Sequence, residues 1–123
     1  KKGTETILLV EDEKAFLQLL ERSLATHGYK MLSAENAEDA LRLMEEKSGA
    51  IDMVVSDVIL PGMNGRDLTN KVLARHPKAR VLFISGYPAD VIGEHGILDS
   101  DVNFLPKPFG MDVFLKKIRA LFE

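Results

Sequence analysis

Five side chains that could do chemistry stand at the ends of apolar runs in the sequence. They are Glu11 and Asp12 after TILLV, Asp57 after MVVS, Ser85 at the end of RVLFIS and Lys107 after VNFLP. If these runs are neighbouring strands, the three carboxylates lie together and repel at roughly 4 kcal/mol per close pair, for an effective dielectric of about 20. Such a cluster predicts a divalent cation, and carboxylate, carbonyl and water ligands suit Mg²⁺ or Mn²⁺. Because Mg²⁺ is commonly shared with phosphate oxygens, the cluster indicates phosphoryl chemistry.

Asp57 is the best candidate for the reacting group. An aspartate carboxylate can accept a phosphoryl group to give an aspartyl phosphate. Lys107 would supply positive charge to a phosphoryl oxygen, and the Ser85 hydroxyl would donate a hydrogen bond to another. Helix capping explains Glu11 or Asp12 equally well when each is taken alone. Capping does not explain Asp57, because the turn-rich PGMNG separates it from the next helical pattern, and we expect its carboxylate to be ionised and exposed.

The elements that must position these groups alternate along the chain. Apolar strand patterns occupy residues 6–10, 29–34, 53–56, 80–85 and 102–106. Helical spacing follows each of them, with Gly28 ending the first helix, Asn36 capping the second, and a closing amphipathic helix over 113–122. The least regular segment is 88–98, where Gly93 and Gly96 allow at most a brief helix. Five strands alternating with five helices predict an α/β fold with a doubly wound parallel sheet, whose strand ends bring the five groups together.

Composition predicts one domain and argues against nucleic-acid-binding and membrane-spanning proteins. The chain has 123 residues, 46% of them hydrophobic and 28% charged, so we expect a single globular domain over 1–123 with a core from about 6 to 121. A net charge of −3 without a basic run argues against direct nucleic-acid binding. The chain has no cysteine and no apolar run long enough to span a membrane, and its basic start KKGTET lacks the apolar core of a signal peptide. Because it begins without Met and ends just after a helical pattern, we expect a piece of a longer protein. A cytoplasmic location is expected, with membrane anchoring of the parent protein left open.

The joint pattern resembles a known family. VEDE, SDVILPGMNG, ISG and FLPKPF, in this order and spacing, resemble the receiver domain of two-component response regulators from about Thr6 to Leu121. The resemblance implies a flavodoxin-like receiver fold with strand order 2-1-3-4-5. It also implies a Mg²⁺ site formed by Glu11, Asp12, Asp57 and the Ile59 backbone carbonyl, with Asp57 as the residue that is phosphorylated. Ser85 and Lys107 would contact the phosphoryl group, and Ser85 and Phe104 would change conformation in response. The resemblance further implies a cis Lys107–Pro108 peptide bond. Phe104 stands where the family more often has tyrosine.

The function that this resemblance implies is phosphorelay signal transduction. A phosphohistidine on a histidine kinase or phosphotransfer domain would donate its phosphoryl group to Asp57. The surface formed by the fourth helix, fifth strand and fifth helix would then change conformation. The domain would catalyse its own phosphorylation and dephosphorylation without being a conventional enzyme. ETILLVEDE, SGYP and HGILD further resemble receivers of hybrid sensor histidine kinases. Whether the domain forms a homodimer stays open.

Two other functions compete with this one. A Mg²⁺-dependent phosphatase with an aspartyl-phosphate intermediate would want a general acid two residues after Asp57, where this sequence has Ile59. A receiver-like module that works without phosphate would not need all of Glu11, Asp12, Asp57, Ser85 and Lys107. Tyr87, two residues after Ser85, could shield the phosphoryl site, although ordinary partial burial explains it as well.

Overall fold

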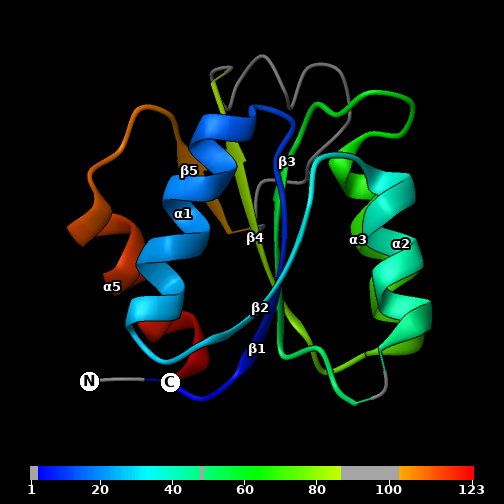
Figure 1. Ribbon diagram of the computed structural model, residues 1–123, viewed down its shortest axis with the longest axis horizontal. Coiled ribbons are helices and arrows are strands. Elements are labelled where there is room, and N and C mark those ends of the chain that lie inside the picture. The colour runs from blue at the N-terminus through cyan, green and yellow to red at the C-terminus, as the bar shows by residue number, and fades with distance from the viewer. Residues whose placement is uncertain (1–2, 48, 87–102) are drawn as a thin grey trace.

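A computed structural model describes residues 3–47, 49–86 and 103–123 of the chain. Five parallel strands form one sheet in the order β2-β1-β3-β4-β5, which confirms the predicted topology (Figure 1). The strands are β1 (Thr6–Val10), β2 (Lys30–Ala34), β3 (Met53–Asp57), β4 (Arg80–Ser85) and β5 (Phe104–Pro106). The helices in the described ranges are α1 (Lys14–Thr26), α2 (Ala37–Glu46), α3 (Gly65–Arg75) and α5 (Met111–Phe122). The helix expected within 88–98 lies outside these ranges.

Helices cover both faces of the sheet, with α1 and α5 on one face and α2 and α3 on the other (Figure 1). Alternate strand residues point to opposite faces. In β1, Ile7 and Leu9 therefore pack in the cluster under α1 and α5, while Leu8 and Val10 pack in the cluster under α2 and α3. Burial on both faces explains why the strands read as continuous apolar runs. None of the helices in the described part of the chain combines the length and apolar character needed to cross a membrane.

Side-chain caps fix where two helices begin. The Asn36 side chain accepts a hydrogen bond from the Asp39 amide at 2.7 Å, which confirms the predicted cap of α2. Asn64 caps α3 in the same way, by accepting from the Asp67 amide at 2.8 Å. Because each cap satisfies an amide that the first helical turn leaves free, it defines the residue at which the helix starts. The loop from residue 58 to 64 is thereby held between Asp57 and α3.

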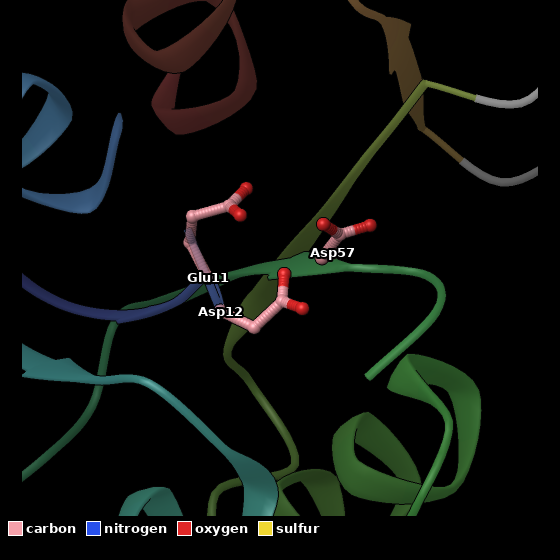
Figure 2. A group of neighbouring side chains, drawn as sticks. All are labelled: Glu11, Asp12 and Asp57. Atoms are coloured by element: carbon pink, nitrogen blue, oxygen red, sulfur yellow. The ribbon is translucent and has the colours of Figure 1, made fainter. Parts of the chain in front are cut away.

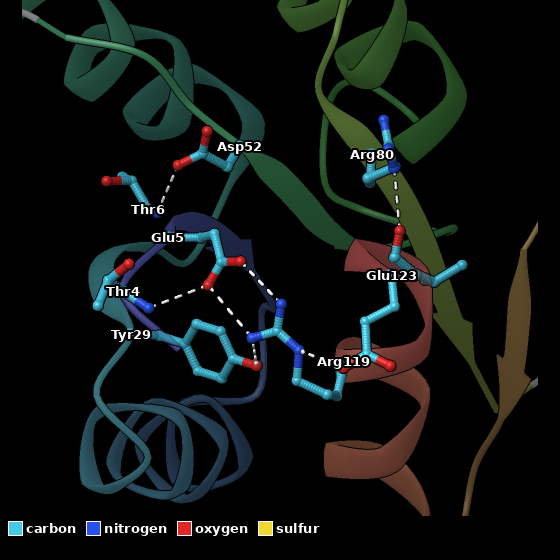
Figure 3. A network of polar contacts seen from close by, with 9 residues as sticks. Thr4, Glu5, Thr6, Tyr29, Asp52, Arg80, Arg119 and Glu123 are labelled. Atoms are coloured by element: carbon cyan, nitrogen blue, oxygen red, sulfur yellow. Dashed lines mark hydrogen bonds and ion pairs between the residues drawn. The ribbon is translucent and has the colours of Figure 1, made fainter. Parts of the chain in front are cut away.

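Arg119 ties α5 to the amino-terminal edge of the sheet (Figure 3). Its guanidinium lies 2.9 Å from Glu5 Oε2 and donates to the Tyr29 hydroxyl at 3.3 Å. The hydrogen bond from Arg119 holds the pKa of Glu5 below its ordinary value. This network lies at the strand ends opposite to Asp57, so it fixes α5 without entering the cluster of polar groups at the other edge.

Candidate functional site

Three carboxylates meet at the carboxyl edge of the sheet (Figure 2). Glu11 and Asp12 follow β1, and Asp57 is the last residue of the adjacent β3. The register pairs Val10 with Ser56, so the next residue of each strand, Glu11 and Asp57, stands at the same level. One carboxylate oxygen from each of Glu11, Asp12 and Asp57 lies within 4.8 Å of the others. The predicted convergence of the acids is therefore present in the structure.

The Lys107 ammonium bridges two of these carboxylates. Its Nζ lies 2.7 Å from Glu11 Oε1 and 3.0 Å from Asp57 Oδ2. The Lys107 amide donates to the Ser85 carbonyl at 2.7 Å, which anchors the chain beyond β5 to the end of β4. The second oxygen of Glu11, Oε2, accepts from the Glu13 amide at 2.9 Å. Glu11 thus holds the lysine from one side while Asp57 holds it from the other.

Burial distinguishes the two neighbouring acids. Glu11 is fully buried, and burial raises the pKa of its carboxyl even though Lys107 opposes that shift. Asp12, one residue later, is exposed. Burial acts to lower the pKa of Lys107, but hydrogen bonds to Glu11 and Asp57 outweigh it and leave that pKa raised. The lysine is therefore a fixed positive charge within the cluster.

The expectation that Asp57 is exposed is wrong. Its relative exposure is 7%, because the carboxylate ends a strand that is buried along its whole length and the Lys107 ammonium lies against Oδ2. Exposure at this edge comes instead from Asp12 and from Ile59, which is 40% exposed.

Ser85 lies on β4, the strand next to Asp57, and Phe104 lies on β5, one strand further away. Asp57 pairs with Ile84, which places the buried Ser85 one residue further along the edge. Phe104 is partly buried and packs against the small cluster formed by Val58 and Phe83. The Lys107–Pro108 peptide bond is cis, the isomer that the resemblance implies. Tyr87 lies outside the described residues, so its shielding role stays a prediction.

Comparison with protein families identifies this arrangement. Residues 7–119 match the family described as the response regulator receiver domain. The chain belongs to this family. The receiver domain shows the expected five-stranded parallel architecture and carries the acidic cluster at the sheet edge where the sequence predicted it.

Related proteins place receiver domains of this kind in longer signalling chains. The sensor kinase CckA of Brucella abortus (strain 2308) is 37% identical over 121 residues, which are 98% of this chain but 13% of the kinase. The response regulator protein FleR of Pseudomonas aeruginosa is 32% identical over 103 residues, 84% of this chain and 21% of that protein. A crystal structure of the receiver domain from the hybrid histidine kinase CckA superposes with a TM-score of 0.80 at 36% identity, covering 96% of this chain and 99% of that one.

Three features around the receiver-domain site were not predicted from the sequence. The Phe16 ring of α1 has its centroid 5.0 Å from Lys107 Nζ. The Ser56 hydroxyl donates to the Asp57 carbonyl at 2.8 Å, and the Gly65 amide donates to the Val58 carbonyl at 2.7 Å. A serine inside the apolar run MVVS was the one available signal for the Ser56 contact.

Proposed function

We propose that this receiver domain accepts a phosphoryl group from a phosphohistidine on Asp57 and passes a signal by changing its surface. The observation that carries the proposal is the Lys107 ammonium, 3.0 Å from the Asp57 carboxylate inside a cluster of three acids. A carboxylate that faces a fixed cation is suited to phosphoryl transfer, because the charge on the transferring group is offset where it develops.

The donor set of the cluster fits a Mg²⁺ ion. The cluster holds three carboxylates and one ammonium, so when fully ionised it keeps two excess negative charges. Glu11, Asp12 and Asp57 supply hard oxygen atoms, the ligand type of Mg²⁺ and also of Mn²⁺, and the Ile59 backbone carbonyl is the proposed fourth ligand. When bound, Mg²⁺ supplies positive charge that offsets the phosphoryl oxygens.

Asp57 acts as the nucleophile in this proposal. One of its carboxylate oxygens forms the new bond to phosphorus while the bond between phosphorus and the histidine nitrogen breaks. The imidazole leaves with the electron pair of that bond and takes a proton from water. Lys107 Nζ stands beside Asp57 and donates to a phosphoryl oxygen, and the Ser85 hydroxyl at the neighbouring strand end donates to another. Little covalent chemistry is left to the protein, so positioning and charge provide the catalysis.

In this proposal, phosphorylation of Asp57 changes the conformation of Phe104 through Ser85 and Val58. Phosphorylation gives the Ser85 hydroxyl a new acceptor and alters the strand end at which Val58 follows Asp57. Phe104 packs against Val58 and Phe83, so its packing responds to that change. The surface of the expected fourth helix, β5 and α5 would then shift. Phosphorylation can only bias an existing equilibrium by its differential affinity for the two states, so partial activity without phosphate is expected.

The proposed partner is a histidine kinase or a histidine phosphotransfer domain. Support comes from the 37% identity to a segment of the sensor kinase CckA, which makes a hybrid kinase the favoured parent protein. In that setting the receiver domain works on the cytoplasmic side of the membrane. A homodimer through the switching surface would be compatible with this function and needs a separate measurement of oligomeric state.

Intact mass spectrometry tests the proposal. The domain is incubated with Mg²⁺ and a small-molecule phosphodonor, in parallel with Asp57→Asn. The wild type is expected to gain one phosphoryl group, and the variant none. No adduct on the wild type, or an undiminished adduct on the variant, would refute the assignment. A phosphatase would instead turn over the donor continuously, and Ile59 at the position of the general acid argues against that alternative.

A further inference from the structure

We infer that Phe16 is a positioning residue for phosphoryl transfer, because its ring fixes the Lys107 ammonium between Glu11 and Asp57. This inference rests on the proposed function, in which Lys107 offsets charge on the phosphoryl group. The Lys107 Nζ lies 5.0 Å from the centroid of the Phe16 ring, within the distance of about 6 Å at which a cation is attracted to an aromatic face. The ammonium is thus contacted from three segments: by Glu11 after β1, by Asp57 at the end of β3 and by Phe16 in α1.

A lysine ammonium needs such confinement. Its side chain has four rotatable bonds and carries a compact point charge, so it loses much rotamer freedom when it is held in one place. Hydrogen bonds to Glu11 and Asp57, at 2.7 and 3.0 Å, hold two of the three N–H donors of the ammonium and leave its remaining side to other contacts. The ring adds a third, apolar side to the position of the ammonium, and the Lys107 side chain is 22% exposed.

Phe16 is itself held by other aromatic rings. Its centroid lies 5.7 Å from that of Phe109, the second residue after Lys107, at an interplanar angle of 56°. Phe109 in turn stacks on the fully buried Phe114 of α5, with the centroids 5.3 Å apart. Tilted and offset ring pairs of this kind are favourable arrangements. The ring over Lys107 is therefore anchored to both α1 and α5 and is not a freely moving surface side chain.

Substitutions at Phe16 separate its aromatic face from its apolar bulk. Phe16→Leu keeps an apolar side chain but removes the ring face, whereas Phe16→Tyr keeps that face. With a small-molecule phosphodonor, which needs no docking surface for a protein partner, Phe16→Leu is expected to slow Asp57 phosphorylation about 2- to 5-fold, the rate equivalent of an exposed cation–π contact. Phe16→Tyr is expected to retain the wild-type rate. Leu19→Ala, at an exposed position of the same helix, is the matched control and should not change the rate.

A measurement on the metal-free protein tests the geometry without activity. The ring above the ammonium should shift the NMR resonances of the Lys107 ε-methylene, identified by their loss in Lys107→Arg. The shift should disappear in Phe16→Leu and persist in Phe16→Tyr. Unshifted lysine resonances in the wild type, or equal phosphorylation rates in wild type and Phe16→Leu, would overturn the inference. A wild type that takes no phosphoryl group would refute the proposed function instead, while the NMR result would still test the contact.

Discussion

Gly65 lies where a side chain would meet the backbone of Asp57, so Gly65→Ala should disturb the end of β3. A Cβ built at this position stands 2.2 Å from the Asp57 carbonyl oxygen, well inside the 3.0 Å that such contacts essentially never fall below. The two segments would have to separate by about 0.8 Å, the difference between these values. That movement also stretches the hydrogen bond from the Gly65 amide to the Val58 carbonyl.

The expected cost follows from these contacts. Overpacking costs about 1 to 3 kcal/mol, and weakening a buried hydrogen bond adds about 0.5 to 1.5 kcal/mol. The preference of a helix for alanine over glycine offsets at most about 1 kcal/mol of this cost. Gly65→Ala should therefore lower the free energy of unfolding by about 2 kcal/mol. The same displacement changes the orientation of the Asp57 carboxylate, so the rate of Asp57 phosphorylation should also fall.

Urea denaturation followed by circular dichroism measures this cost from the unfolding midpoint and slope. Gly86→Ala is the matched control, because a Cβ there meets no atom of the described residues within 4 Å. Its stability should stay within about 0.5 kcal/mol of wild type. If Gly65→Ala unfolds at the wild-type midpoint with an unchanged slope, the backbone contact does not constrain the site and the reasoning is wrong.

Three further predictions address the metal, the core and the Arg119 network. Asp12→Ala should lose most of its Mg²⁺ affinity in a calorimetric titration, and unchanged affinity would refute the proposed ligand set. Phe83→Ala should lower the free energy of unfolding by about 3 to 5 kcal/mol in urea, because Phe83 is 2% exposed; a loss below about 1 kcal/mol would contradict tight packing there. Arg119 lowers the pKa of Glu5 from its ordinary value of 4.5, so the stability that this pair adds is complete above pH 4.5 and is lost as pH falls through the lower folded value. The stability gap between wild type and Glu5→Gln should therefore shrink in acid, and a gap that widens there would contradict this linkage.

Periodicity and strand ends were sufficient to predict the sheet and the acidic cluster. Apolar runs such as TILLV and MVVS identify strands buried on both faces, and the parallel arrangement brings their carboxyl ends to one edge. The cap at Asn36 was also predictable, since asparagine before a helical stripe satisfies a free amide. These features follow from local sequence patterns and from the rule that parallel strands end at the same edge of a sheet.

The finer properties of the site depend on packing that the sequence does not display. Glu11 and Asp12 read as an equivalent pair, yet the first is buried against Lys107 and the second is exposed. The contact of Phe16 with Lys107 depends on how α1 is rotated against Phe109, which helical spacing alone does not determine. The low exposure of Asp57 likewise depends on a lysine fifty residues away in the chain. The segment with Tyr87 and the expected fourth helix stays at the stage of prediction.

Chemical localisation of the phosphoryl group tests the central claim most directly. The domain is phosphorylated with a small phosphodonor in the presence of Mg²⁺, reduced with borohydride to convert an aspartyl phosphate to homoserine, and digested for peptide mass spectrometry. The proposed function predicts homoserine at position 57, in the peptide that contains β3. Phosphorylation of Asp12 would instead give homoserine at position 12, in the segment that follows β1. A modification at any position other than 57, or none at all, would contradict the proposal.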